Sequence, residues 1–128
     1  YTKAYSRLSG LKLSGEDKQL YNKLSVLASV SGKYDAYKSF SDSGYVTMAA
    51  DSLVCAAGRC AVNAENAKEY GCELQLEQLK NIISDTLSSQ YGLSYDDAIA
   101  LYNIDDRDDY TLALTQKLNE LGIKEETK

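Results

Sequence analysis

The chain contains no proline, no histidine and no tryptophan among its 128 residues. Because proline is absent, nothing in the sequence forbids long helices. The absence of histidine removes the commonest general base and the commonest metal ligand. Only three cysteines are present, no two of them form a Cys-x-x-Cys pair, and no histidine could complete a zinc site. These absences argue against nucleophilic catalysis and against structural zinc, and we expect no cofactor.

The charge and hydrophobic content indicate one ordinary globular domain over residues 1–128. Hydrophobic residues make up 44% and charged residues 26%, and a chain of this length can bury enough surface to fold without a metal or disulfide. The net charge of −5 repels phosphate backbones, so nucleic acid is not an expected partner. No apolar run approaches the roughly 20 residues of a membrane span, so no transmembrane segment is expected.

The first long helix is predicted by apolar residues at steps of three and four. A capping-box-like pair, Ser14 and Asp17, precedes it, and Gly44 ends it. Gly32 lies inside the pattern without changing its phase, so one continuous helix is expected. The apolar stripe consists of Leu20, Leu24, Leu27, Val30, Tyr34, Tyr37 and Phe40.

Glycine marks the ends of the next helices. A second helix is expected over Ala49–Tyr70, ended by Gly71, and a third over Glu73–Tyr91, ended by Gly92. Leu93 supplies the apolar residue that folds back on such an ending.

Two shorter helices are predicted after the third. Ser94 and Asp97 form a second capping-box-like pair, and Asp105 or Asp106 begins a last helix that ends at Gly122. No alternating apolar and polar segment predicts a strand. The sequence therefore predicts an all-α domain of five to six helices, arranged as helical hairpins or a small bundle. We expect residues 1–12 to be frayed and residues 124–128 to form a disordered tail.

The three cysteines are interpreted as small buried apolar residues. Cys55 and Cys60 are five residues apart, which places them on diverging faces of a helix, and a bond between them would distort it. Cys72 reaches neither of them without a chain reversal, and a disulfide through Cys72 is the alternative.

The segment from Tyr37 to Ala56 resembles one tetratricopeptide unit, in which two antiparallel helices pack through small and aromatic residues. Phe40 matches the aromatic residue late in the first helix, and Gly44 matches the turn. The matches on the second helix are Ala49, Leu53 and Ala56. The resemblance covers about one repeat unit, and stable arrays need about three repeats. It implies a peptide- or protein-binding groove without catalysis, and the alternative is a generic helical hairpin with a glycine turn.

A dense acidic cluster follows the predicted fourth helix. A calcium loop needs a glycine at its sixth place and a glutamate at its twelfth, and no register of this segment supplies both. Acidic residues here also suit a helix N-terminus through the helix dipole. A calcium- or magnesium-dependent acidic site within residues 96–109 is kept as an alternative. Its ligands would be Asp105, Asp106, Asp108 and Asp109.

The function predicted from these observations is that of a non-enzymatic protein- or peptide-binding or scaffold module in a larger bacterial protein. A purely structural spacer is the other alternative, and the oligomeric state is left open. We expect an extracytoplasmic part of a surface or membrane-anchored protein. The residues expected to line the binding groove are Lys33, Tyr37, Lys38 and Ser41. This mixture suits an acidic or extended peptide, whereas the competing interpretation packs Tyr37 inward against Tyr34.

Overall fold

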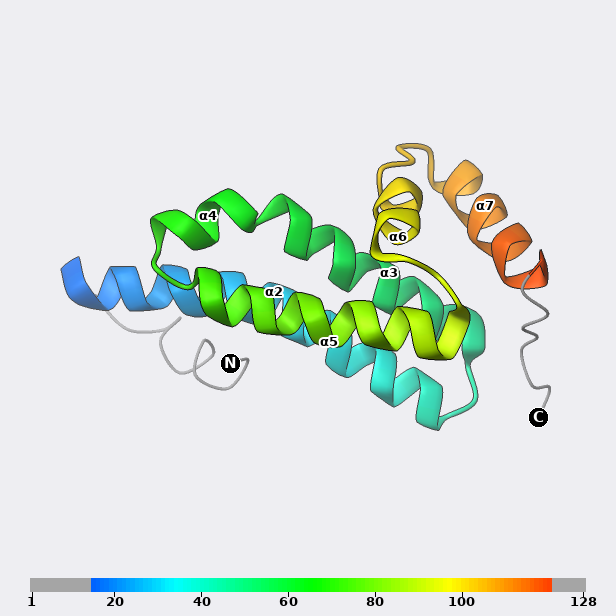
Figure 1. Ribbon diagram of the computed structural model, residues 1–128, viewed down its shortest axis with the longest axis horizontal. Coiled ribbons are helices and arrows are strands. Elements are labelled where there is room, and N and C mark those ends of the chain that lie inside the picture. Colours follow the sequence, from blue (N-terminus) through cyan, green and yellow to red (C-terminus); the bar gives the residue numbers. More distant parts are fainter. Residues whose placement is uncertain (1–14, 121–128) are drawn as a thin grey trace.

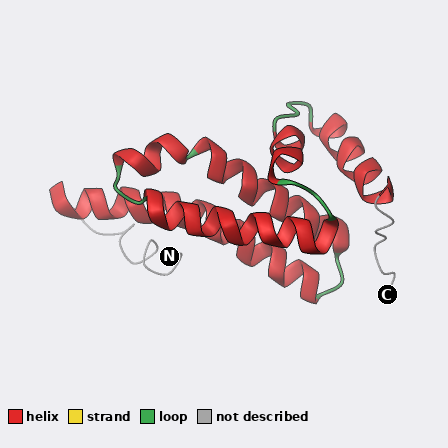
Figure 2. Ribbon diagram, in the orientation of Figure 1, coloured by secondary structure: helices red, strands yellow, loops and turns green. Residues whose placement is uncertain are grey.

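The computed structural model describes residues 15–120, and these residues form six helices and no strand (Figure 2). The predicted all-α fold with five to six helices is therefore confirmed. The predictions for residues 1–12, Ser14, Gly122 and residues 124–128 lie outside the described residues. The helices are α2 (Gly15–Asp42), α3 (Val46–Val62), α4 (Ala64–Glu69), α5 (Glu73–Tyr91), α6 (Tyr95–Tyr102) and α7 (Arg107–Glu120).

Helix α3 is the centre of the fold. It contacts each of the other five described helices, and nine of its 17 residues are buried. Most of these buried residues are small, so neighbouring helices can approach the α3 backbone from several sides at once. In Figure 1, α2, α3 and α5 run along the long axis of the molecule, and α6 and α7 lie together at one end.

The hairpin formed by α2 and α3 is the most extensive helix pair among the described residues. Gly44 joins the two helices with a φ of 81°, which suits glycine because it has no Cβ. Ala49, Leu53 and Ala56 are fully buried, as close packing of such a hairpin requires. These contacts agree with a generic hairpin as well as with a tetratricopeptide unit, so the resemblance stays a prediction.

The predicted apolar stripe of α2 is wrong at its first residue, Leu20, which is not buried. Leu27, Val30 and Tyr37 are buried, but Leu20 is 45% exposed. Helix α2 has 28 residues, whereas α3 has 17, and its first turns extend past α4 and the start of α5 (Figure 1). Leu20 therefore lies where the described helices offer little surface to cover it.

The predicted helix over Ala49–Tyr70 is also corrected, because it is broken at Asn63. The Asn63 backbone has φ −92° and ψ 3°, and its Nδ2 donates to the carbonyl of Arg59 at 2.8 Å. This side-chain bond competes with regular helical bonding at the end of α3. The chain continues as the short helix α4 and turns back at Gly71, whose φ is 73°.

The ends of α5 and α6 agree with their predicted signals. Gly92 is left-handed with a φ of 64°, and the N–H of Leu93 donates to the carbonyl of Leu87 at 3.2 Å. Ser94 and Asp97 form a reciprocal capping box, at 3.0 Å and 3.2 Å. The hydrogen bonds from the Ser94 backbone and side chain lower the pKa of Asp97.

No helix within residues 15–120 combines the length and apolar character that a membrane span requires.

Candidate functional site

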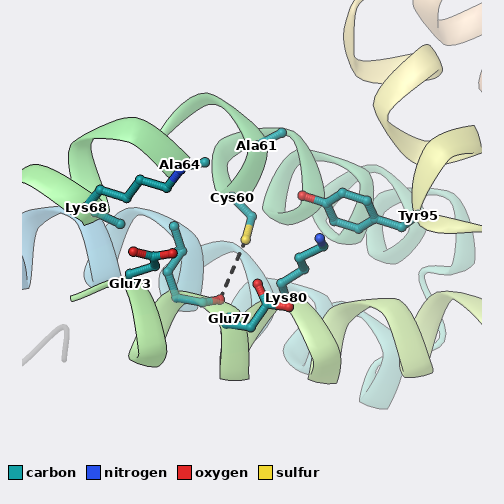
Figure 3. Close-up of a pocket in the computed structure, with 10 residues that line it drawn as sticks. Cys60, Ala61, Ala64, Lys68, Glu73, Glu77, Lys80 and Tyr95 are labelled. Atoms are coloured by element: carbon teal, nitrogen blue, oxygen red, sulfur yellow. Dashed lines mark hydrogen bonds between the residues drawn. The ribbon is translucent and has the colours of Figure 1, made fainter. Parts of the chain in front are cut away.

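An open cleft lies between α3 and α4 on one side and α5 on the other. Its volume is about 340 Å³, within the range of about 300–1,000 Å³ typical of ligand pockets. The break at Asn63 contributes to the cleft, because residues on both sides of the break line it. Its lining residues, drawn in Figure 3, are Cys60, Ala61, Ala64, Ala67, Lys68, Glu73, Leu76, Glu77, Lys80 and Tyr95.

The floor of the cleft is apolar. Cys60, Ala67 and Leu76 are buried beneath it. The Cys60 thiol donates to the carbonyl of Leu76 at 3.8 Å, so it points from α3 to the α5 backbone (Figure 3). Burial raises the pKa of the Cys60 thiol, which keeps it protonated at neutral pH. Cys60 therefore acts here as a small apolar contact and not as an activated nucleophile.

Tyr95 and Lys80 form one end of the cleft. The Tyr95 hydroxyl donates to the carbonyl of Ala57 at 3.2 Å, which fixes α6 against α3. Lys80 Nζ lies 5.0 Å from the centre of the Tyr95 ring, a distance typical of a cation–π contact. Burial raises the pKa of Tyr95, so this hydroxyl remains a donor at neutral pH.

The rim leaves two acidic groups free for a ligand. Lys68 pairs with Glu65 at 3.7 Å, and Lys80 lies over Tyr95. Within residues 15–120, neither Glu73 nor Glu77 forms an ion pair, and both are exposed. They are four residues apart on α5, so both carboxylates lie on one face of the helix. The cleft therefore combines an apolar floor with an unpaired acidic edge.

The binding groove predicted around Tyr37 is not present in the predicted form. Tyr37 is only 7% exposed, and its ring packs 5.7 Å from Tyr34 and 6.4 Å from Tyr91, measured between ring centres. The interpretation that placed Tyr37 inward against Tyr34 is the one that agrees with the structure. Tyr37 is covered in part by the Tyr91 ring of α5, which the spacing of residues along α2 could not reveal.

Of the other three predicted groove residues, Lys38 and Ser41 are engaged with the Tyr34 and Tyr37 side chains, and Lys33 lies elsewhere. Lys38 pairs with Asp35 at 3.9 Å and lies over the Tyr34 ring, and Ser41 hydrogen-bonds to the Tyr37 side chain. Lys33 instead lines a different cavity, between α2, α3 and α7.

The alternative metal site is not assembled either. Asp105, Asp106, Asp108 and Asp109 are all exposed, and no three acidic or cysteine side chains within residues 15–120 are arranged to hold a metal ion. Asp106 accepts the N–H of Asp109 at 2.9 Å, so it caps α7. The helix-dipole explanation of this cluster accounts for its position.

The three cysteines are free thiols, and the alternative disulfide through Cys72 is not formed. Cys60 and Cys72 are buried, whereas Cys55 is half-buried and donates to Asp51 at 3.9 Å. The prediction of small buried residues is therefore confirmed for two of the three.

Asp51 is the most heavily engaged carboxylate of the described fold. One of its oxygens accepts both the thiol of Cys55 and a short hydrogen bond from the hydroxyl of Tyr110. The second bond joins α7 to α3 across 59 residues of sequence. Burial and this hydrogen bond raise the pKa of Tyr110, so the hydroxyl stays a donor at neutral pH.

Replacement of Tyr110 by phenylalanine is expected to lower the free energy of unfolding by about 1.5–3 kcal/mol, because a half-buried charged acceptor loses its donor. Urea unfolding measures this change. Tyr45→Phe is the matched control, since Tyr45 is 51% exposed, and it should change stability little. Equal stability of the two variants would show that the Tyr110 to Asp51 bond contributes nothing.

The described part of the chain is therefore an all-α domain with an open cleft between α3, α4 and α5. In comparisons with protein-family models, curated proteins and solved structures, the chain matched none of them.

Proposed function

We propose that this chain is a non-enzymatic protein- or peptide-binding module, and that the cleft between α3, α4 and α5 is its binding site. The observation that supports this function is the combination of an apolar floor with unpaired Glu73 and Glu77 at the edge. The cleft is sized for one apolar side chain and its flanking backbone rather than for a folded surface.

The ligand that fits this cleft is a peptide segment with a large apolar side chain next to lysine or arginine. Burying the apolar side chain against Cys60, Ala67 and Leu76 supplies affinity, at about 25 cal/mol per Å² of apolar surface removed from water. The carboxylates of Glu73 and Glu77 attract the basic residue and orient the segment. The net charge of −5 adds long-range attraction for the same ligand.

A purely structural spacer is less well supported, because large apolar side chains are exposed beside the cleft. Val62 and Leu74 are 66% and 78% exposed, and they follow the lining residues Ala61 and Glu73 in sequence.

Selection of a phage-displayed random-peptide library on the 128-residue chain tests the proposal. We expect enrichment of peptides in which leucine, isoleucine or phenylalanine adjoins lysine or arginine. Ala64→Trp, which fills the cleft, should abolish binding of the selected peptides. Enrichment of no sequence class, or of peptides that bind the Ala64→Trp variant equally well, would contradict the proposed site.

The contribution of the two carboxylates at the acidic edge can be tested by removing their charges. The double variant Glu73→Gln, Glu77→Gln should weaken binding of a selected peptide by about tenfold, equivalent to about 1.4 kcal/mol. Fluorescence anisotropy with a labelled peptide measures the change, and added salt should reduce it. The matched control is Asp85→Asn, Glu120→Gln, which removes the same charge from exposed positions outside the cleft. Similar losses in both double variants would indicate net charge alone.

A further inference from the structure

A second cavity, separate from the peptide cleft, lies where α2, α3 and α7 meet the loop after α6. Its volume is about 260 Å³, and polar side chains dominate its lining. Lys33 comes from α2, Asp51 and Cys55 from α3, and Arg107 and Tyr110 from the first turn of α7. Three segments distant in sequence therefore bring charged groups to one small space.

Of the two acidic groups that line this cavity, Asp51 already has hydrogen-bond donors. Asp51 accepts from the Tyr110 hydroxyl and the Cys55 thiol, so its nearest partners are neutral donors. Within residues 15–120, neither Lys33 nor Arg107 forms an ion pair. Two cationic groups thus line one cavity, and neither forms an ion pair with the two carboxylates, Asp51 and Asp105, that line it too.

Both cations act on the groups around Asp51. Burial raises the pKa of Cys55, and Lys33 opposes that shift. Burial likewise raises the pKa of Tyr110, and Arg107 opposes it. These opposite effects agree with the geometry, because a charge must lie close to a group to change its pKa.

We propose that this cavity binds a small organic carboxylate, held between the ammonium of Lys33 and the guanidinium of Arg107. A guanidinium matches a carboxylate with two parallel hydrogen bonds, and lysine adds a point charge. The volume admits a ligand of a few heavy atoms, and Ile104 lines the cavity as an apolar surface for its carbon chain. Asp105, which also lines the cavity, disfavours multiply charged anions such as phosphate.

A bound ligand would also hold α7 more firmly against the rest of the fold. Helix α7 packs chiefly on α3 and α6, and Arg107 is its first residue. A carboxylate joined to Lys33 and Arg107 ties α7 to α2, a contact that is minor or absent between those helices without ligand. Opening of α7 should therefore become less frequent when the cavity is filled.

Thermal unfolding of the 128-residue chain with three probe pools tests the inference. The pools are the free amino acids, straight-chain monocarboxylates, and inorganic phosphate. At about ten times the dissociation constant, a carboxylate should raise the Tm by roughly 4 °C. If only the amino acids raise the Tm, the ligand also places an ammonium group near Asp105. If only the plain acids raise it, the ligand has no such group. Either response supports the carboxylate site.

The variants Lys33→Gln and Arg107→Gln should each remove the response, and Lys38→Gln, on the same helix as Lys33, should retain it. Hydrogen exchange of the unmodified chain supplies an independent measure, since the carboxylate should increase protection of α7. No rise in Tm with any pool, an equal rise with phosphate, or a rise that persists in both cavity variants would overturn the proposal. Peptide binding at the other cleft is measured separately, so either proposal can fail alone.

Discussion

Replacement of Gly58 by alanine is expected to destabilise the fold by about 1–3 kcal/mol, because it overpacks the contact between α3 and α6. Gly58 is buried in the middle of α3, and a Cβ at this position would overlap the ring carbons of Tyr102. Tyr102 is the last residue of α6, so the overlap is relieved only if its ring turns aside or α6 moves away from α3. The intrinsic preference of helices for alanine, about 1 kcal/mol, offsets only part of this cost.

Gly32→Ala is the matched control for Gly58→Ala. Gly32 also lies inside a helix, but nothing within 4 Å would meet its added Cβ. That variant should therefore stabilise the chain by about 0.5–1 kcal/mol. In a Tyr102→Ala background, Gly58→Ala should lose its penalty, which a double-mutant cycle with urea unfolding measures. If the two glycine variants were equally stabilising, the close contact with Tyr102 would be absent.

Local chemistry explains why much of the helix pattern could be predicted. Both ends of α5 agree with the prediction, because Gly71 and Gly92 need left-handed backbone and Leu93 packs on the helix that it follows. The Ser94 and Asp97 capping box is likewise a contact between residues three apart. Signals of this kind are contained within one turn of the chain, so the sequence alone displays them.

Contacts between distant segments could not be predicted in the same way. The break at Asn63 is local, but no proline or glycine marks it, and only the structure shows the Asn63 side chain bonded to the carbonyl of Arg59. The Gly58 position became informative only when α6 was placed against it. The exposure of Leu20 likewise depends on where the neighbouring helices end.

The candidate sites show the same division. Lys33 and Tyr37 were predicted as groove residues from their positions on one helix, but helix α5 covers Tyr37 through Tyr91 and α7 brings Arg107 beside the cavity that Lys33 lines. The cleft between α3, α4 and α5 was not predicted from the sequence. Its alanines and Cys60 look like ordinary core residues in sequence, and only the turn at Asn63 leaves them beside an open space.

The fold is expected to lose stability steeply in alkaline solution, because several of its tyrosines are buried as neutral groups. Burial, together with the nearby Tyr37, raises the pKa of Tyr91 to about 12. Tyrosine in an unfolded chain has a pKa near 10. The unfolded state therefore releases this proton first, and the stabilisation is complete below about pH 10 and is lost between about pH 10 and pH 12. Tyr91 alone accounts for about 2–3 kcal/mol over that interval.

The other buried groups with raised pKa values also make the fold less stable as the pH rises. Burial raises the pKa of Tyr37, Tyr95 and Tyr110, so each adds to the loss at high pH. The raised thiol pKa values of Cys60 and Cys72 move the start of the decline to about pH 9. Urea unfolding from about pH 8 to about pH 11 should therefore give a free energy of unfolding that falls progressively with pH.

Tyr91→Phe separates the contribution of one buried hydroxyl from general alkaline denaturation. The ring is 7% exposed and packs against Tyr37, and phenylalanine preserves that packing. The variant should lose less stability than the unmodified chain above about pH 10, because one group no longer ionises in the unfolded state. Tyr45→Phe, at a position 51% exposed, should follow the unmodified chain throughout. Parallel pH curves for the unmodified chain and Tyr91→Phe would mean that Tyr91 ionises equally in both states and contributes nothing to the alkaline loss.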